Sequence, residues 1–475
     1  NKDISDYIVI KKNLNWDDLQ AFEFASNKFP FLFINKEKVR SYKDNFVFSH
    51  VLGYVGYRKD IEDKKLNNLK FGISGIEQIF DKKLIGKDGW IKLETNSRGR
   101  IKKELKKKIS IPGENIKTNL ISSVQEYSYS LLKDINGAAV MINCKDGGVN
   151  CLLSTPSFDN NEFSNGVSSL KWKSLINNNS KPLLNRCIAG LYSPGSTYKL
   201  ITALFVIEKM GFDPKTRFFC DGYVEFGNRK FHCWKKEGHG SLNLKEAIKK
   251  SCDCYFYNLA KDIKIDPLSE FSKKFFMGLS TNIDIPNELV GLMPNTKWKI
   301  KNKGERWQKG ETLNTVIGQG FMLATPLQIT VMTAILASGK RIEPKILRSS
   351  NNFFEEIGIS EASLKFIRDS MYSVVNEWEG TAFSSRIRGK FKLVGKTGTS
   401  QVRKITKEER ESGVLKNEEI IYKLRDHSIF TCFAPYNDPE YALTIIAEHM
   451  GSGSKVAAPI AQKIMKFTLD KFKKT

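Results

Sequence analysis

The stretch "SPGSTYKL" (residues 193–200) decides how the rest of the sequence is interpreted. Pro194-Gly195 is a turn pair, and Ser196 opens an apolar helical pattern that ends before Gly211. The spacing Ser196-x-x-Lys199 places a hydroxyl and an amine on one face of a helix, as a serine nucleophile with a lysine base requires. A serine at a helix N-terminus can equally be a simple cap, so the stretch alone leaves two interpretations open.

The Ser-x-x-Lys spacing occurs at four places: Ser130/Lys133, Ser168/Lys171, Ser196/Lys199 and Ser452/Lys455. Only the third follows a Pro-Gly turn and opens a clear helix. Downstream, Ser251-x-Asp253 lies at another helix start, and a strand pattern carries the one Lys-Thr-Gly of the chain, Lys396-Thr397-Gly398. This ordered triplet is shared by serine β-lactamases and penicillin-binding proteins, and it favours Ser196 as a nucleophile over Ser196 as a cap.

The 475 residues predict two domains, 1–115 and 116–475, because single cores rarely grow beyond about 250–300 residues. The first is rich in charge and in short strand patterns, including one over 46–57. The second has helices between strands, which predicts an α+β domain. Its predicted strands lie at 137–156, 391–401, 428–436 and 441–449, and its predicted helices at 124–135, 196–209, 244–262, 267–276, 325–338 and 457–472.

The formal net charge is +24, and the lysines are spread throughout the chain instead of forming a stripe with aromatic residues. We therefore expect no nucleic-acid partner; the charge suits an anionic surface such as a membrane or cell wall. The most apolar stretch, "FMLATPLQITVMTAILASG" (321–339), is interrupted by Thr and Gln, which predicts a buried helix and no transmembrane segment.

Further stretches resemble the class B penicillin-binding proteins along nearly the whole chain: "HVLGYVG" (50–56), "GISGIEQIFDKKLIGKDGW" (72–90), "IGQGFMLATPLQ" (317–328) and "RDHSIFTCFAPYNDP" (425–439). Residues 234–257 and 424–436 are similar to the elongation-type members, the penicillin-binding protein 2 group. Septal members are expected to carry Ser-x-Asn where this chain has Ser251-x-Asp253. Two departures are Arg40-Ser41-Tyr42-Lys43 in place of an Arg-x-Tyr-Pro box, and Ser193 in place of a common proline.

The resemblance implies a serine β-lactamase-like transpeptidase domain, with helices on an antiparallel sheet, behind a β-rich N-terminal pedestal module. The implied activity is the D,D-transpeptidation of peptidoglycan stem peptides in cell-wall elongation. Ser196 would attack the penultimate carbonyl of a D-Ala-D-Ala stem peptide. Lys199, neutralised by burial and by the nearby Lys396, would accept its proton, and Ser251 would pass it to the leaving D-Ala. Asp253 would hold that helix start in place.

The resemblance assigns the remaining site residues to substrate binding. Lys396, Thr397 and Thr399 would recognise the terminal carboxylate, and Gly398 would let the ligand approach the backbone. Backbone N–H groups of Ser196 and Thr399 would form the oxyanion hole. β-Lactams would acylate Ser196 and stay, because no carboxylate base for deacylation is evident. No cofactor is expected in catalysis.

The implied setting is the periplasm, on a single membrane-spanning anchor that precedes the sequence given. The implied partners are a SEDS-family glycosyltransferase and scaffold proteins of the elongation complex. Alternatives with the same fold are a D,D-carboxypeptidase, a β-lactamase and a non-catalytic β-lactam sensor. A zinc-dependent nucleic-acid binder would suit the charge and the cysteines, but it gives no reason for the three ordered motifs.

Four sulfur and imidazole side chains, Cys220, Cys233, His239 and Cys252, have the spacing Cys-x12-Cys-x5-His-x12-Cys. Three thiolates and one imidazole suit tetrahedral zinc, and some relatives are thought to hold a metal in this stretch. We therefore expect a structural zinc site that would fix the second catalytic motif, since Cys252 lies between Ser251 and Asp253. The alternatives are a disulfide, isolated buried thiols, or a ligand set that includes Asp221, His232 or Cys254.

Overall fold

The computed structural model describes residues 10–11, 14–29, 32, 34, 39–57, 70–97, 101–348, 354–403, 409, 415 and 417–473. By contacts the chain forms two compact units, one of residues 1–43 with 81–115 and one of residues 44–80 with 116–475. This grouping differs from the uninterrupted division expected at residue 115. Residues 44–80 join the larger unit because Val51 and Ile76 are part of its hydrophobic core.

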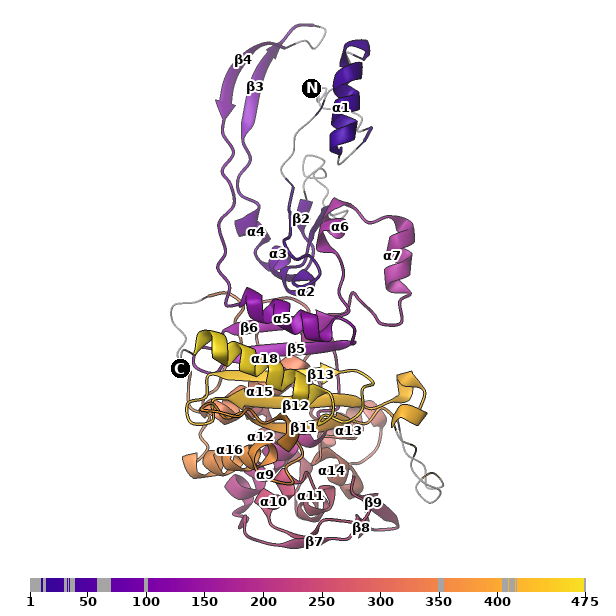
Figure 1. Ribbon diagram of the computed structural model, residues 1–475, viewed down its shortest axis with the longest axis vertical. Coiled ribbons are helices and arrows are strands. Elements are labelled where there is room, and N and C mark those ends of the chain that lie inside the picture. Colours follow the sequence, from indigo (N-terminus) through magenta and orange to yellow (C-terminus); the bar gives the residue numbers. More distant parts are fainter. Residues whose placement is uncertain are drawn as a thin grey trace. The chain divides into compact units, whose positions relative to one another are not determined.

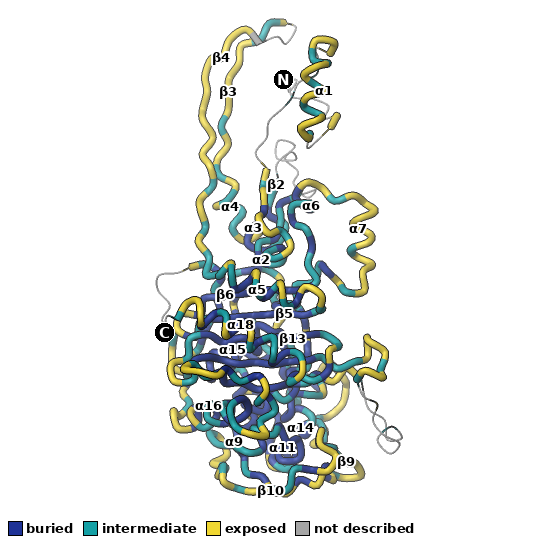
Figure 2. Tube along the Cα trace, viewed as in Figure 1, coloured by how far each residue is buried: buried dark blue, intermediate teal, exposed yellow. Residues whose placement is uncertain are grey.

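The smaller unit is built on a two-stranded antiparallel ribbon, β3 (Trp90–Thr95) with β4 (Ile101–Lys108). The side chains of β3 are exposed on both faces of this ribbon, apart from the half-buried Thr95 (Figure 2). Among the described residues of the unit, the helices are α1 (Trp16–Ala25), η1 (Ser26–Lys28) and α4 (Asp81–Leu84). A capping box between Asn15 and Asp18 begins α1.

A five-stranded antiparallel sheet forms the centre of the larger unit (Figure 1). Its strand order is β11-β12-β13-β5-β6, with bounds Val394–Ser400, His427–Ala434, Tyr441–Ala447, Gly137–Asn143 and Val149–Thr155. Every residue of β6 and β13 is buried, so the sheet is covered on both faces. The four predicted strand regions are thereby confirmed, and the sheet brings the two ends of the larger unit's sequence together.

Helices cover both faces of this sheet. From α15 (Pro326–Ser338), Thr333 hydrogen-bonds Thr431, which in turn bonds Thr444, the register partner of Val140. From α18 (Ala457–Phe472), Thr468 contacts the sulfur of Met141, the residue after Val140. Successive strand side chains point to opposite faces, so α15 and α18 lie on opposite sides of the sheet. α5 (Ser122–Leu132) packs beside α18.

The remaining helices and strands of the larger unit are α2 (Ser49–Leu52), β1 (Val55–Tyr57), β2 (Lys70–Gly72), α3 (Gly75–Ile79), α6 (Asn160–Asn165), α7 (Ser169–Ile176), α8 (Arg186–Ala189), η2 (Gly195–Thr197), α9 (Lys199–Met210), β7 (Phe218–Cys220), β8 (Tyr223–Phe226), β9 (Arg229–His232), β10 (Gly240–Leu242), α10 (Leu244–Lys249), α11 (Asp253–Ala260), α12 (Ile265–Ser272), η3 (Lys273–Phe275), α13 (Thr296–Lys303), α14 (Lys309–Thr315), α16 (Glu361–Asn376), η4 (Phe383–Ser385), η5 (Asn417–Glu419) and η6 (Tyr422–Leu424).

Two predicted elements were wrong in part. The strand predicted over 46–57 is one helical turn, α2, followed by the short strand β1. The helix predicted over 244–262 is two helices, α10 and α11, because Ser251 between them has a left-handed φ of 55° that a continuous helix cannot contain. Across the described ranges, no helix combines the length and apolar character needed to cross a membrane.

Candidate active site

Ser196 lies in η2, the single turn that leads into α9. Neither η2 nor α9 has a side-chain cap, and the hydroxyl that bonds back to Pro194 O is that of Thr197, at 2.8 Å. The cap interpretation of Ser196 is therefore wrong. Ser168, by contrast, does cap a helix, since its side chain accepts from the N–H of Lys171. The Ser196 side chain is half-buried and caps neither η2 nor α9.

Gly195 lets this turn approach the sheet. Its φ is 54°, and a Cβ added there would lie 2.5 Å from the carbonyl oxygen of Thr399. Its N–H donates to Gly318 O at 2.9 Å. Gly398 faces the same turn, because a Cβ at that position would lie 3.0 Å from Thr197 Cγ2 and 3.1 Å from Pro194 O. The two glycines thus hold the Ser196 turn directly against the Lys-Thr-Gly strand, β11.

Lys199 joins the first motif to the second. The side chain is fully buried at the first residue of α9. Its Nζ donates to Asp253 Oδ1 at 2.7 Å and to Ser251 O at 2.8 Å, and it lies 3.5 Å from Ser251 Oγ. The ammonium group therefore has a carboxylate partner, which stabilises its charge inside the protein.

Lys396 reaches the same serine from the third motif. Its Nζ, fully buried in β11, donates to Ser251 Oγ at 2.8 Å and to Thr397 O at 3.1 Å. Burial, and then the charge of Lys199, hold the pKa of Lys396 well below its usual range. Burial likewise raises the pKa of Asp253, against the opposing effect of Lys199. The neutral amine was expected at Lys199, whereas in the structure it is Lys396 whose pKa is lowered.

Four of the five expected catalytic side chains thus converge: Lys199, Ser251, Asp253 and Lys396. The fifth, Ser196, lies in the turn that is held against β11, the strand of Lys396. The hydroxyl of Ser251 lies between the two amines, and the left-handed backbone at Ser251 puts it there. A non-glycine residue in this conformation is strained, so the surrounding contacts must hold it in place.

Three residues that hold the site were missed from the sequence. The backbone N–H of Trp234 donates to Asp253 Oδ2 at 3.0 Å, and its indole donates to Ser251 O at 3.1 Å. The amide of Gln319 donates to Thr399 O at 2.9 Å, and Thr381 bonds the Thr397 hydroxyl at 2.8 Å. The signal for Gln319 was present, because it lies between two glycines with positive φ, Gly318 and Gly320. Trp234 begins the stretch 234–257 that resembles the elongation-type members, but nothing in that stretch predicts its contacts with Ser251 and Asp253. Thr381 lies in none of the stretches or motifs.

A buried ion pair anchors the segment that leads to Ser196. Arg186 is 2% exposed, and its guanidinium donates to Glu448 Oε2 at 3.0 Å. Tyr192, four residues before Ser196, donates its hydroxyl to the other oxygen of Glu448 at 2.8 Å. The Tyr192 ring packs edge-on against His427, which is the register partner of Ser400 in β11. This cluster could not be predicted from the sequence, because Glu448 lies more than 250 residues after Arg186 and Tyr192.

The four expected metal ligands also come together. The ligand atoms of Cys220, Cys233, His239 and Cys252 all lie within 4.8 Å of one another. His239 Nδ1 lies 3.6 Å from Cys220 Sγ and 3.5 Å from Cys233 Sγ. All eight cysteines have free thiols, so no disulfide joins this cluster. The cluster adjoins the second motif, since the Asp253 N–H donates to Cys233 Sγ at 3.4 Å.

Comparisons with known proteins agree with this geometry. Residues 137–466 match the family "Penicillin binding protein transpeptidase domain", and residues 1–118 match "Penicillin-binding Protein dimerisation domain". Peptidoglycan D,D-transpeptidase MrdA of Haemophilus influenzae is 34% identical over 98% of this chain and 74% of its own length. The chain is a class B penicillin-binding protein of the MrdA type. Its activity is the D,D-transpeptidation of peptidoglycan in cell-wall elongation.

Other members of the family show how far the likeness extends. MrdA of Escherichia coli K12 is 33% identical over 96% of this chain and 75% of its own length. The penicillin-binding protein 2 in a complex with MreC from Helicobacter pylori has a TM-score of 0.86 and 31% identity, over 97% of this chain and 84% of its own. Penicillin-binding protein 2 of Pseudomonas aeruginosa, in complex with WCK 5153, has a TM-score of 0.78 and 32% identity, over 92% of this chain and 94% of its own.

Proposed function

We propose that this penicillin-binding protein forms its acyl-enzyme on Ser196, with Lys199, Ser251 and Lys396 moving the proton. The observation that carries this proposal is the convergence of two buried amines on one hydroxyl, Ser251 Oγ, beside the Ser196 turn. Ser196 itself is free of the capping role that its position would otherwise suggest.

The proton path follows from the contacts of Ser251. Transfer of one proton from Lys199 to Ser251 Oγ, and of the serine's own proton to Lys396, leaves Lys199 neutral. The distances that such a transfer spans are 3.5 Å and 2.8 Å. Neutral Lys199 then accepts the proton of Ser196 as its oxygen bonds to the stem-peptide carbonyl carbon. Because the pKa of Lys396 lies well below its usual range, its amine is unprotonated more often than that of an ordinary lysine, and its lone pair is then available to accept a proton.

The acyl transfer then has two balanced halves. Attack by Ser196 gives a tetrahedral oxyanion, which we place at the N–H groups of Ser196 and Thr399. Its collapse breaks the bond to D-Ala, whose amine takes a proton from Ser251 while Ser251 Oγ takes one from the protonated Lys199. An amine of a second stem peptide attacks the ester and loses its proton to the same relay, and Ser196 leaves with a proton. Thr397, Thr399 and Lys396 bind the terminal carboxylate of the donor, beside Gly398.

A transpeptidation assay tests this assignment. A D-Ala-D-Ala stem peptide is the donor and a second stem peptide supplies the acceptor amine, and both released D-Ala and cross-linked product are measured. Ser196→Ala is expected to abolish both products, by a factor of about 10³ or more. Ser130→Ala is the matched control, because Ser130 has the same Ser-x-x-Lys spacing but is exposed on α5.

Two results would contradict the proposal. The first is cross-linked product from the Ser196→Ala variant at the wild-type rate. The second is wild-type protein that releases D-Ala to water alone while an acceptor amine is present, which would indicate a carboxypeptidase.

We further propose that Cys220, Cys233, His239 and Cys252 hold a structural zinc ion. Tetrahedral zinc with Zn–S bonds of about 2.3 Å separates neighbouring sulfurs by about 3.8 Å, and the observed spread of up to 4.8 Å fits such a site. A bound zinc would supply cross-links among the end of β7, the residue after β9, the residue before β10 and the N-cap of α11. Cys252 would thereby fix the helix start that carries Asp253.

The partners and the location are proposed by likeness to the relatives. The Helicobacter pylori structure is a complex with MreC, and a further solved chain, with a TM-score of 0.76 and 28% identity, belongs to a peptidoglycan synthase complex that coordinates polymerization and crosslinking. We propose that this chain works with a scaffold protein of the MreC kind and a SEDS-family glycosyltransferase, in the periplasm on a membrane anchor. β-Lactam acylation of Ser196 is proposed from the match to the penicillin-binding transpeptidase family.

A further inference from the structure

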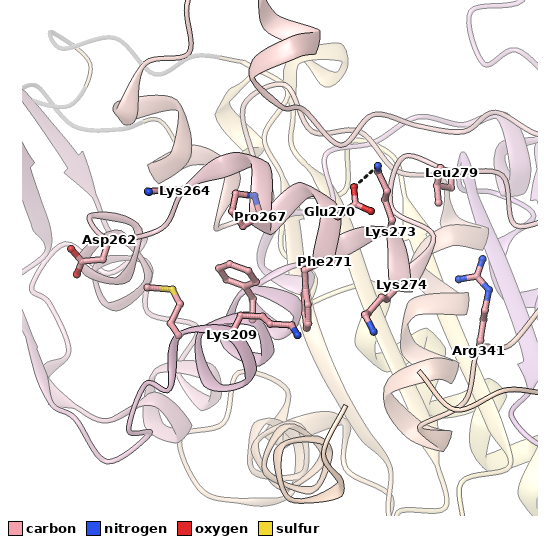
Figure 3. Close-up of a pocket in the computed structure, with 12 residues that line it drawn as sticks. Lys209, Asp262, Lys264, Pro267, Glu270, Phe271, Lys273, Lys274, Leu279 and Arg341 are labelled. Carbon is pink, nitrogen blue, oxygen red and sulfur yellow. Dashed lines mark hydrogen bonds and ion pairs between the residues drawn. The ribbon is translucent and has the colours of Figure 1, made fainter. Parts of the chain in front are cut away.

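A cavity of about 750 Å³ lies at the C-terminal end of α9, and none of its lining residues belongs to the active site (Figure 3). Its walls come from the end of α9, from α12 and η3, and from Arg341 beyond α15. The volume is within the range of about 300–1,000 Å³ that small-molecule sites occupy. Neither the transpeptidation mechanism nor the metal cluster uses this cavity.

Aromatic side chains form the floor of the cavity. Phe205 of α9 and Phe271 of α12 are each 4% exposed, and their rings meet edge-on with centroids 5.5 Å apart. Met210, the last residue of α9, is 41% exposed and extends the apolar surface to the rim, and Leu279 lines it further along. Apolar surface of this kind favours a ligand with an apolar body.

The rim is strongly basic. Five cations line the cavity against two carboxylates, and one of those carboxylates, Glu270, is already paired with Lys273 at 2.5 Å (Figure 3). Within the described part of the chain, Lys209 and Arg341 have no carboxylate at ion-pair distance. The guanidinium of Arg341 lies over the ring of Phe276, 4.2 Å from its centroid, which fixes its place at the edge of the cavity.

The charges are also unevenly distributed. Figure 3 draws Asp262 and Lys264 at one end of the cavity and Lys274 and Arg341 at the other. The first end carries one charge of each sign, so it has little net attraction for an ion. At the second end the carboxylate drawn nearby, Glu270, is the one paired with Lys273. Lys274 donates to a backbone carbonyl, Ile357 O, at 2.6 Å, and no carboxylate among the described residues forms an ion pair with it.

We propose that this cavity binds an amphipathic carboxylate, with its apolar body on Phe205 and Phe271 and its head at Lys209, Lys274 and Arg341. A neutral apolar molecule would leave the cations unpaired, and an amphipathic cation would be repelled by them. A small hydrophilic anion would gain nothing from the aromatic floor. An apolar chain or ring with one carboxylate satisfies both halves of the site. The ligand would contact α9, the helix that begins at Lys199.

Calorimetric titration of the whole chain with decanoate, and in parallel with decanol, tests this proposal. Decanoate is expected to bind one-to-one and more tightly than decanol. The double substitution Lys209→Gln with Arg341→Gln should weaken decanoate about fivefold or more and leave decanol unchanged. The matched control, Lys297→Gln with Lys301→Gln, removes the same charge from α13 and should change neither affinity.

A second variant tests the apolar half of the site. Leu279→Trp fills part of the cavity and should weaken decanoate and decanol alike. The proposal is overturned if decanoate shows no saturable binding, or if the α13 control weakens decanoate as much as the cavity variant does. It is likewise overturned if Leu279→Trp leaves both affinities at their wild-type values.

Discussion

Lys199 and Lys396 are both fully buried, and the one carboxylate beside them, Asp253, is at ion-pair distance from Lys199 only. Two buried ammonium groups beside one carboxylate would leave a net positive charge, which burial disfavours. One of the two amines must therefore lose its proton more easily than the other. The pKa of Lys396 is the one held well below its usual range. The hydroxyl of Ser251 connects this amine to Lys199, so the site can move a proton without moving a side chain far.

The first prediction concerns Lys396→Met. Because the pKa of Lys396 is lower in the folded than in the unfolded chain, the unfolded chain binds more protons between the two pKa values. The free energy of unfolding of the wild type should therefore rise with pH across that window. Lys396→Met removes the buried amine and with it the cost of burying a charge. The variant should be more stable than the wild type by about 1–3 kcal/mol at neutral pH, while losing acylation.

Chemical denaturation of both proteins from neutral to alkaline pH measures this difference. The stability difference is expected to shrink as the pH rises toward the usual range of a lysine. A Lys396→Met protein that is less stable than the wild type at every pH would contradict the account.

At the scale of elements, the active site depends on places where helices stop. The turn η2 precedes α9, and a break at Ser251 separates α10 from α11. A continuous helix uses its backbone groups for hydrogen bonds within itself. At each interruption, such backbone groups and the side chains beside them are turned toward the active site instead. Gly195 is the residue that allows the first interruption to contact β11.

The second prediction compares two glycines with nearly the same backbone. Gly195 and Gly211 have φ values of 54° and 63°, but only at Gly195 does an added Cβ meet an atom, Thr399 O at 2.5 Å; nothing lies within 4 Å at Gly211. Gly211→Ala should destabilise the protein by about 1–2 kcal/mol with normal acylation. Gly195→Ala should lose more stability and most acylation, as thermal denaturation and β-lactam labelling would show. Equal behaviour of the two variants would contradict the proposed packing.

The third prediction concerns the metal cluster. Cys233→Ser should remove one zinc ion per chain and lower the melting temperature by several degrees, because a structural zinc contributes to folding. Elemental analysis and calorimetry measure the two effects. Cys254→Ser is the control, since Cys254 is a buried neighbour outside the four-ligand group, and it should keep its zinc. The proposed site would be refuted by wild-type protein that contains no zinc and is as stable without zinc as it is with zinc added.

At the scale of the whole molecule, the catalytic motifs could be predicted from the sequence, whereas most of the residues that hold those motifs in place could not. The three motifs and the strands carry local patterns, and the structure brings Lys199, Ser251 and Lys396 together as expected. Trp234 could not be predicted, because it acts through a backbone N–H and an indole with no periodic or motif signal. Ser251-x-Asp253 was expected at a helix start, but the helical pattern over 244–262 gave no sign of the break before it, because neither glycine nor proline marks that break.

Contacts between residues far apart in the chain also could not be predicted from the sequence. Glu448 accepts from both Arg186 and Tyr192, and no spacing rule connects the end of β13 to the segment before Ser196. Only the order of the sheet brings these parts of the chain together. Likewise, residues 44–80 could not be assigned to the larger unit without knowing that Val51 and Ile76 enter its core.

The fourth prediction tests that long-range pair. Glu448→Gln leaves the buried guanidinium of Arg186 without its carboxylate and should cost about 3 kcal/mol of stability, with slower acylation. Glu440→Gln is the matched control, because its partner Lys473 is more exposed, and it should cost about 1 kcal/mol or less. Urea denaturation compares them. Equal losses would contradict the positioning role of Glu448.

The role of Ser196 as the nucleophile is tested most directly by the site at which a β-lactam becomes covalently attached. The wild-type protein is labelled with a fluorescent penicillin, digested, and the modified peptide is identified by mass spectrometry. We expect one adduct, on Ser196, and no labelling of Ser196→Ala, while Ser130→Ala is labelled like the wild type. An adduct on any other residue, or unchanged labelling of Ser196→Ala, would contradict it.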